Sequence, residues 1–295
     1  MMDAVSQIIE THRNTVLMLV DIGVWGFRNI LQRHPDRVRN IGIFEDGLIG
    51  LSAGLSISGM VPFVYGISPF IVNRAYEQLK LDFAYQKLSG NFITTGASYD
   101  FSTLGYSHYC PEDVAALLLL PGIEIVTPAT PAQFVSLFNA SWNDGKPTYF
   151  RLTDHSCKSE CNAEFGKATV LQTGKKGLVI SVAETLDSVM NAVVGMDVTV
   201  LHYSTIAPFD VETLQKYAHE QILICSPFYQ GVITNLVVKA LYPQSLCIDE
   251  IGVPLEILRN YGTKQENDDY CGINCSIVRE KVARIVSKSD IEVLE

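Results

Sequence analysis

Short apolar runs alternate with longer stretches of helical spacing along the first half of the chain. Each apolar run predicts a buried strand, and each stretch that follows it predicts one helix. Strands separated by single helices are typical of a parallel sheet that is covered by helices on both faces. The strands predicted in this half are 15–20, 40–44, 61–65, 92–95, 123–126 and 148–152.

Glycine and proline mark the ends of two of the predicted helices. One helix covers 48–58, and Gly59 suits its C-terminal cap. A long helix begins near Pro69 and runs to about residue 87. Proline is tolerated at that start because its missing N–H would have no partner in the first turn.

A polar stretch without periodicity, 154–167, predicts a linker between two halves. The alternation then resumes, with strands predicted at 178–182, 198–201, 222–225 and 246–249. Residues 264–270 are polar and predict a loop, and 276–286 predict a closing helix. We therefore expect an α/β fold with two parallel or mostly parallel sheets covered by helices. The expected organisation is a first domain over 1–155, a linker over 156–167 and a smaller domain over 168–295.

Composition and charge narrow the class of protein. Hydrophobic residues make up 47% of the 295 positions and charged residues 18%, which suits a large core and argues against disorder. The net charge of −10 repels a phosphate backbone, so we expect no nucleic-acid partner. The sequence contains neither a long apolar window nor a basic start followed by an apolar run, so we expect no membrane span and no signal peptide. Seven cysteines, an odd number, favour reduced thiols in a cytoplasmic protein.

The loops at the carboxyl ends of the strands hold the candidate chemistry, because ligands of such sheets bind there. Asp21 follows the first predicted strand, and Glu45 follows the second, beside an apolar helix start. A partly desolvated carboxyl at this place can share a proton with a basic ring nitrogen, which is general acid–base work. The alternative is that Glu45 or Asp46 only caps the next helix.

Four more side chains are candidates, and each has a simpler alternative. Phe70 could stack on a heterocycle or pack in the core. Arg74, one helical turn later, could meet an anion or form a surface ion pair. His108 lies in a loop of small and aromatic residues, where it could carry protons or face solvent. Arg151 ends an apolar strand, so its charge needs a partner or a ligand.

Motifs of other enzyme classes are absent from the sequence. It has no G-x-x-x-x-G-K-[ST] loop, no G-x-G-x-x-G after a strand, no G-x-S-x-G elbow and no H-E-x-x-H. These absences argue against nucleotide hydrolysis, simple dehydrogenase chemistry, and serine or zinc hydrolysis.

Taken in chain order, the candidates resemble the thiamine-diphosphate family that includes transketolase and deoxyxylulose-phosphate synthase. The resemblance covers nearly the whole chain and is weaker in the second half. A string of short motifs carries it: Pro35-Asp-Arg37, Ile41-Gly-Ile-Phe-Glu45, Leu51-Ser-Ala-Gly-Leu55, Gly59, Phe70, Arg74-Ala-Tyr-Glu-Gln78, Ser107-His108, Glu112-Asp113, Leu120-Pro-Gly122, Val126-Thr-Pro128 and Arg151.

This resemblance implies the transfer of a two-carbon ketol unit from a ketose to an aldehyde, with thiamine diphosphate as the cofactor. Glu45 matches the acid that hydrogen-bonds N1′ of the cofactor's aminopyrimidine, and Phe70 matches the aromatic residue that stacks on that ring. His108 matches a catalytic histidine that contacts the reacting sugar oxygens, and Arg151 matches an arginine that binds substrate phosphate. Arg74 is a further candidate for substrate binding, and Asp21 a further candidate for cofactor binding.

The family binds the diphosphate and its Mg²⁺ or Ca²⁺ with a separate domain that carries a Gly-Asp-Gly motif and a downstream Asn. This sequence has no Gly-Asp-Gly, and Glu45-Asp-Gly47 is only superficially similar to it. The resemblance therefore implies the C-terminal subunit of a two-polypeptide transketolase, active only with an N-terminal partner subunit that holds the diphosphate and the metal. We expect a homodimer of this chain within a heterotetramer.

Three positions depart from the family's pattern. Its phosphate-contacting His falls at Gly96, its Asp that reads the substrate's 2-hydroxyl falls at Leu104, and its Ser after the first strand falls near Val24 or Trp25. An apolar side chain does not select for a hydroxyl, so we expect a modified or nucleotide-linked sugar as the substrate. Two alternatives stay open: the β-subunit of a 2-oxo-acid dehydrogenase, and a non-catalytic subunit on the same fold.

Overall fold

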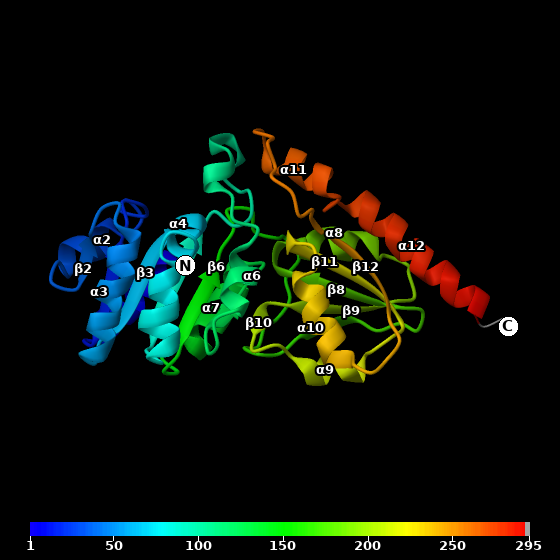
Figure 1. The fold of residues 1–295 in the computed structure, drawn as a ribbon, viewed down its shortest axis with the longest axis horizontal. Coiled ribbons are helices and arrows are strands. Elements are labelled where there is room, and N and C mark those ends of the chain that lie inside the picture. Colours follow the sequence, from blue (N-terminus) through cyan, green and yellow to red (C-terminus); the bar gives the residue numbers. More distant parts are fainter. Residues whose placement is uncertain (293–295) are drawn as a thin grey trace.

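The computed structural model describes residues 1–292 as two sheets with helices packed around them. Figure 1 shows the first sheet and its helices in blue to green, beside the second sheet in green to yellow. The last helix, drawn in red, runs along the outer flank of the second sheet, and it packs on α8.

The first sheet has seven strands in the order β10-β5-β6-β4-β3-β1-β2. All its neighbouring strands are parallel except β10 and β5, which are antiparallel. The strands are β1 Thr15–Leu19, β2 Val38–Asn40, β3 Val61–Ile67, β4 Gly90–Thr95, β5 Glu124–Val126, β6 Pro147–Arg151 and β10 Thr205–Ala207.

Helices cover both faces of this sheet because its strands are apolar on both sides. In β1, Leu17 and Leu19 pack with the helices of one face, whereas Val16 and Met18 pack with those of the other. The helices of this half are α1 Met2–Thr11, α2 Arg28–Arg33, α3 Glu45–Ile57, α4 Ser68–Val72, α5 Tyr76–Gln78, α6 Asp113–Leu118 and α7 Pro131–Ser141.

The second sheet has five strands in the order β12-β11-β8-β9-β7, and only β7 is antiparallel to its neighbour. Its strands are β7 Thr169–Gln172, β8 Leu178–Val182, β9 Thr199–Tyr203, β11 Gln221–Tyr229 and β12 Cys247–Val253. Its helices are α8 Leu186–Ala192, α9 Val211–Lys216, α10 Val232–Leu241, α11 Lys264–Cys271 and α12 Cys275–Glu292. The predicted fold class, two mostly parallel sheets flanked by helices, is confirmed.

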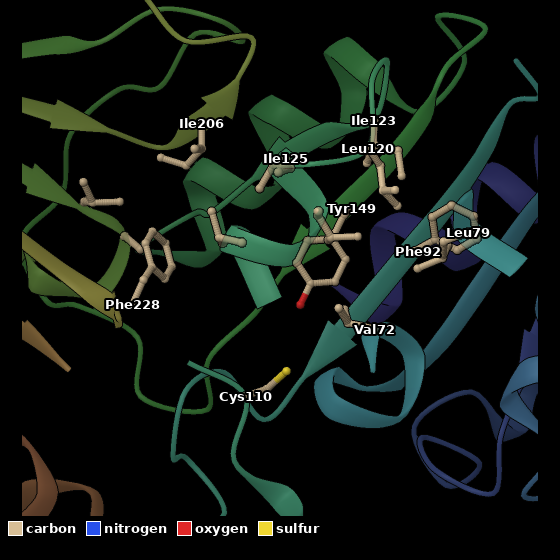
Figure 2. Close-up of a cluster of buried hydrophobic side chains, with 14 of the residues drawn as sticks. Val72, Leu79, Phe92, Cys110, Leu120, Ile123, Ile125, Tyr149, Ile206 and Phe228 are labelled. Carbon is tan, nitrogen blue, oxygen red and sulfur yellow. The ribbon is translucent and has the colours of Figure 1, made fainter. Parts of the chain in front are cut away.

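One hydrophobic cluster joins the two halves. Figure 2 shows Ile125 and Tyr149 of the first sheet close to Ile206 and Phe228 of the second half. In addition, β10 belongs to the second half of the chain but adds an edge strand to the first sheet. Within the described part of the chain, no helix is both long and apolar enough to cross a bilayer. The domain boundaries at 155 and 168 stay a prediction.

Three element predictions were wrong. The second strand ends at Asn40 rather than at residue 44, and Gly42 follows with a φ of +84° that a strand does not accommodate. The long helix over 69–87 is divided into α4, α5 and a π-helix over Leu79–Tyr85. Residues 264–270, predicted as a loop, form α11.

A capping box explains why the polar segment of α11 is helical. The Thr263 hydroxyl accepts a hydrogen bond from the Glu266 N–H, and the Glu266 carboxylate accepts one from the Thr263 N–H. These bonds satisfy N–H groups that a helix start otherwise leaves unpaired. A Gly272 in the left-handed conformation then ends the helix.

We expect the free energy of unfolding to fall as the pH drops from about 6.5 to about 4, because of His202. His202 belongs to β9, its imidazole is fully buried, and burial lowers its pKa to about 4. In this range the unfolded chain takes up a proton that the folded chain does not, which costs up to about 1.4 kcal/mol per pH unit. Urea unfolding at several pH values measures this slope. His202→Gln should flatten it, whereas the exposed His155→Gln should leave it unchanged.

Candidate functional site

Glu45 lies at the start of α3 and is almost fully buried, with 1% of its surface exposed. Its carboxylate oxygen Oε2 accepts a hydrogen bond from Arg74 Nη1 at 2.5 Å. Arg74 follows α4, which begins directly after β3, so the carboxyl end of β3 brings the guanidinium to Glu45. The anion that Arg74 meets in this structure is therefore Glu45 itself.

Phe70 and His108 continue this arrangement. The Arg74 guanidinium lies 4.5 Å from the centre of the Phe70 ring, at cation–π distance. The His108 ring meets the Phe70 ring edge-on, with 5.2 Å between the ring centres, and its Nδ1 lies 3.0 Å from the Ser107 hydroxyl. We call Glu45, Arg74, Phe70 and His108 the Glu45 row.

A cavity of about 320 Å³ adjoins the Glu45 row. Phe70 and Arg74 line it, together with Pro69, Asn73, Tyr106, Ser107, Tyr109 and Glu112. Asn73 Nδ2 donates a hydrogen bond to Glu112 Oε1 at 2.7 Å. Burial raises the pKa of Glu112, and this bond opposes the shift. The sequence placed Glu112 in a motif but gave no sign that it would line a cavity.

Asp21 does not contact the Glu45 row. It is exposed at the end of β1 with a φ of +59°, and it pairs with Asn40 at the end of β2. The Asp21 N–H donates to the Asn40 side-chain oxygen at 2.9 Å, and Asn40 Nδ2 donates to Asp21 Oδ1 at 3.0 Å. These two bonds join the carboxyl ends of two neighbouring strands, and the role of Asp21 in binding a cofactor stays a prediction.

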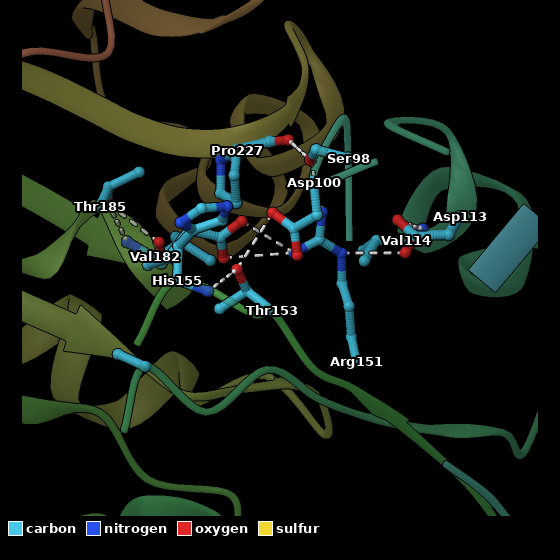
Figure 3. Close-up of polar contacts among 12 residues, drawn as sticks. Ser98, Asp100, Asp113, Val114, Arg151, Thr153, His155, Val182, Thr185 and Pro227 are labelled. Atoms are coloured by element: carbon cyan, nitrogen blue, oxygen red, sulfur yellow. Dashed lines mark hydrogen bonds and ion pairs between the residues drawn. The ribbon is translucent and has the colours of Figure 1, made fainter. Parts of the chain in front are cut away.

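Arg151 is almost fully buried, and Figure 3 shows its hydrogen bond to Asp113 as a dashed line. Its Nε donates to Asp113 Oδ2 at 2.9 Å, and its Nη1 donates to Glu184 at 3.2 Å. Its Nη2 donates to the Ser98 hydroxyl at 2.5 Å, and that hydroxyl donates to the carbonyl of Pro227. The guanidinium also lies 4.8 Å from the centre of the Phe228 ring.

The role of Arg151 as a ligand for substrate phosphate stays a prediction, and in this structure its charge is already paired. Its side chain has no exposed surface, and two carboxylates already neutralise its charge. Asp113 is equally buried, and burial raises its pKa while the Arg151 charge opposes the shift. Because Glu184 and Pro227 belong to the second half, Arg151 joins the two halves of the chain.

The second half also holds the loop that carries His108. Tyr109 Oη donates to the carbonyl of Asn260 at 2.5 Å, and the Ser102 hydroxyl donates to the carbonyl of Gly262 at 2.5 Å. Tyr99 Oη donates to Asp268 of α11 at 2.7 Å. Sequence reasoning assigned no chemistry to the second half and missed these contacts, because they join residues more than 150 positions apart.

The residues of the Glu45 row fit the aminopyrimidine ring of a thiamine-type cofactor. A buried carboxyl can share a proton with a ring nitrogen, and an aromatic side chain beside it can pack on a heterocycle, which suits an aminopyrimidine. Among the side chains that the structure describes, residues 1–287, no three His, Cys, Asp or Glu gather in a way that could hold a metal ion.

Comparison with known proteins agrees with this geometry. A family model described as "Transketolase, pyrimidine binding domain" matches residues 1–158, more than half of the chain. This chain belongs to the transketolase family. The resemblance inferred from the sequence motifs is therefore confirmed, and membership implies thiamine diphosphate as the cofactor.

Two relatives and one solved structure extend the similarity of this transketolase-family chain beyond its first half. A protein of Rhodococcoides fascians, named "Uncharacterized 33.6 kDa protein in fasciation locus", is 31% identical over 90% of this chain and 87% of its own length. An apulose-4-phosphate transketolase subunit of Phocaeicola vulgatus is 29% identical over 79% of this chain and 81% of its own length. The structure described as "Split gene transketolase, inactive beta4 tetramer" shares the fold with a TM-score of 0.85 and 23% identity, covering 97% of this chain and 96% of that one.

Proposed function

We propose that this chain is the C-terminal subunit of a thiamine-diphosphate-dependent transketolase. It transfers a two-carbon ketol unit from a ketose to an aldehyde, and it is active only with an N-terminal partner subunit. The Glu45 row carries the proposal, because contacts through Arg74 and Phe70 connect an acid to a histidine, and Arg74 and Phe70 line a cavity. Membership of the transketolase family supports it.

Each residue of the row has a proposed task. When bound, thiamine diphosphate supplies a nucleophilic ring carbon. Glu45 holds a proton at the pyrimidine nitrogen, and Arg74 fixes the orientation of that carboxyl through the bond to Oε2. Phe70 packs against the pyrimidine, and His108 binds the substrate oxygens and moves protons there. The partner subunit holds the diphosphate and its Mg²⁺ or Ca²⁺.

An apolar surface supports a heteromeric assembly. Five large hydrophobic side chains in the first 57 residues are about half or more exposed: Trp25, Ile43, Phe44, Leu51 and Ile57. Exposed apolar side chains that gather on one surface are typical of interaction sites. We propose that these side chains are covered by subunits in a heterotetramer built on a homodimer of this chain. The similar split-gene protein is described as inactive in its beta4 tetramer, which agrees with a need for a second kind of subunit.

We also propose a substrate class and a cellular compartment. The relative from Phocaeicola vulgatus is named for a phosphorylated sugar, which supports a sugar substrate that carries an anion. The seven cysteines are all free thiols in the structure, which supports a location in the cytoplasm.

The test is reconstitution of the complex. The chain is purified alone and together with a candidate N-terminal subunit, chosen because it carries Gly-Asp-Gly. Ketol transfer from a ketose to an aldehyde is then measured with thiamine diphosphate and Mg²⁺. We expect activity from the pair and none from either chain alone. Oxidative decarboxylation of pyruvate by the pair, without ketol transfer, would favour a 2-oxo-acid dehydrogenase instead.

A further inference from the structure

The two arginines that were candidates for binding an anion on the substrate are already paired with carboxylates of the chain. Arg151 is buried between Asp113 and Glu184, and Arg74 is paired with Glu45. The chain as a whole has a net charge of −10, so its overall charge does not attract an anion. An anionic sugar therefore needs another partner at this site.

Arg259, by contrast, is not paired with a carboxylate. It is exposed on the segment between β12 and α11, and its side chain makes no hydrogen bond or ion pair with the described side chains of residues 1–287. It lines a cavity of about 360 Å³ together with Tyr106, Ile257, Leu258, Asn260 and Tyr261. Aromatic and aliphatic walls with one charged group are typical of small-molecule sites, where the polar group fixes orientation and specificity.

This cavity adjoins the one beside the Glu45 row, because Tyr106 lines both. Direct contacts also fix the positions of the two segments that line these cavities. Tyr109 Oη donates to the carbonyl of Asn260, next to Arg259. Gly105 packs directly against the ring of Tyr261, and a Cβ at this position would lie 2.5 Å from that ring. The segment that carries Arg259 is thus fixed against the loop that carries His108.

We propose that the cavity lined by Arg259 is the subsite for the anionic end of a sugar substrate, and that this end is a tetrahedral oxyanion such as a phosphate or a sulfonate. The planar guanidinium suits such an anion because it donates two parallel hydrogen bonds. Tyr106 and Tyr261 pack against the carbon skeleton of the sugar. This inference rests on the proposed transketolase function. It names anionic sugars as the substrate class and Arg259, in the second half, as the residue that binds the anion.

The first experiment measures ketol transfer by the reconstituted complex with a phosphorylated ketose and with the same ketose lacking phosphate. Arg259→Gln is expected to raise KM for the phosphorylated ketose about 10- to 100-fold, since charged hydrogen bonds are lost. KM for the neutral ketose and kcat for both should change little. Arg259→Lys should restore part of the affinity. Arg13→Gln, with the same charge change at an exposed site before β1, is the matched control and should behave as wild type.

The second experiment uses the chain alone, so it does not depend on catalysis. Inorganic phosphate, and sulfate as the sulfonate mimic, are titrated while NMR signals of labelled tyrosines are followed. We expect saturable shifts for Tyr106 and Tyr261 that disappear in Arg259→Gln and persist in Arg13→Gln. Two results would contradict the proposed subsite. One is equal shifts in Arg259→Gln and Arg13→Gln, and the other is an equal rise of KM for the phosphorylated and the neutral ketose in Arg259→Gln. If the anion binds through Arg259 but the reconstituted complex shows no ketol transfer, the subsite is supported and the proposed function is contradicted.

Discussion

Replacing Glu45 with glutamine is expected to lower kcat for ketol transfer by the reconstituted complex by a factor of about 10² to 10⁴. Positioned proton transfer contributes about this much to catalysis, and an amide cannot give and take a proton as a carboxyl does. Glutamine has nearly the same shape and keeps an oxygen that can accept the Arg74 hydrogen bond. Steady-state kinetics at saturating substrate and cofactor measure the change.

The structure offers a matched control for Glu45. Glu124 is also buried and also bound to a cation, with 2.7 Å between its Oε1 and Lys146 Nζ. It begins β5, so it lies at the end of its strand opposite to the carboxyl end. Glu124→Gln should therefore lose some stability but keep its turnover. Unchanged turnover in Glu45→Gln would contradict the proposed role and favour a non-catalytic subunit.

Replacing Arg151 with leucine is expected to lower the free energy of unfolding by about 3–5 kcal/mol. The substitution leaves the carboxylates of Asp113 and Glu184 buried without their counter-charge. It also removes the hydrogen bond to Ser98, which bridges to Pro227 of the second half. Urea unfolding, followed by circular dichroism, measures the loss.

An exposed ion pair provides the comparison for Arg151. Arg284 is bound to Glu280 one turn earlier in α12, and both side chains are more than half exposed. Arg284→Leu should cost less than about 1 kcal/mol, because water screens such pairs. A loss of similar size in Arg151→Leu would mean that the buried cluster does not hold the two halves together. A large loss of phosphate affinity without a loss of stability would restore the ligand role that the burial of Arg151 argues against.

Local patterns were sufficient for the order of elements. The predicted strand over 178–182 coincides with β8, and the predicted strand over 148–152 is displaced by one residue from β6. Both segments have apolar positions whose spacing reflects their own backbone. The helix α11 could not be recognised in this way, because its segment is polar and has no apolar positions at helical spacing. Its helix depends on the Thr263 capping box, a local signal that was present in the sequence and overlooked.

The candidate site was predicted as single residues rather than as an arrangement. Glu45, Phe70 and His108 could each be named from loop position and motif, and their catalytic roles remain proposals. The bond between Arg74 and Glu45 could not be foreseen, because spacing along one helix says nothing about a side chain 29 positions away. The same holds for Arg259, whose place beside Tyr106 depends on a contact between the two halves of the chain.

The sequence by itself determined the α/β class, the mostly parallel sheets and the family, since these follow from periodicity and from motifs that are contiguous in the chain. Only the tertiary structure decided what each charged side chain binds. Arg151 illustrates the difference: the sequence showed a charge that needed a partner, and the fold supplied Asp113, 38 positions away, and Glu184, 33 positions away. The strength of an ion pair depends on distance and burial in space, and neither quantity is encoded in the local pattern of residues.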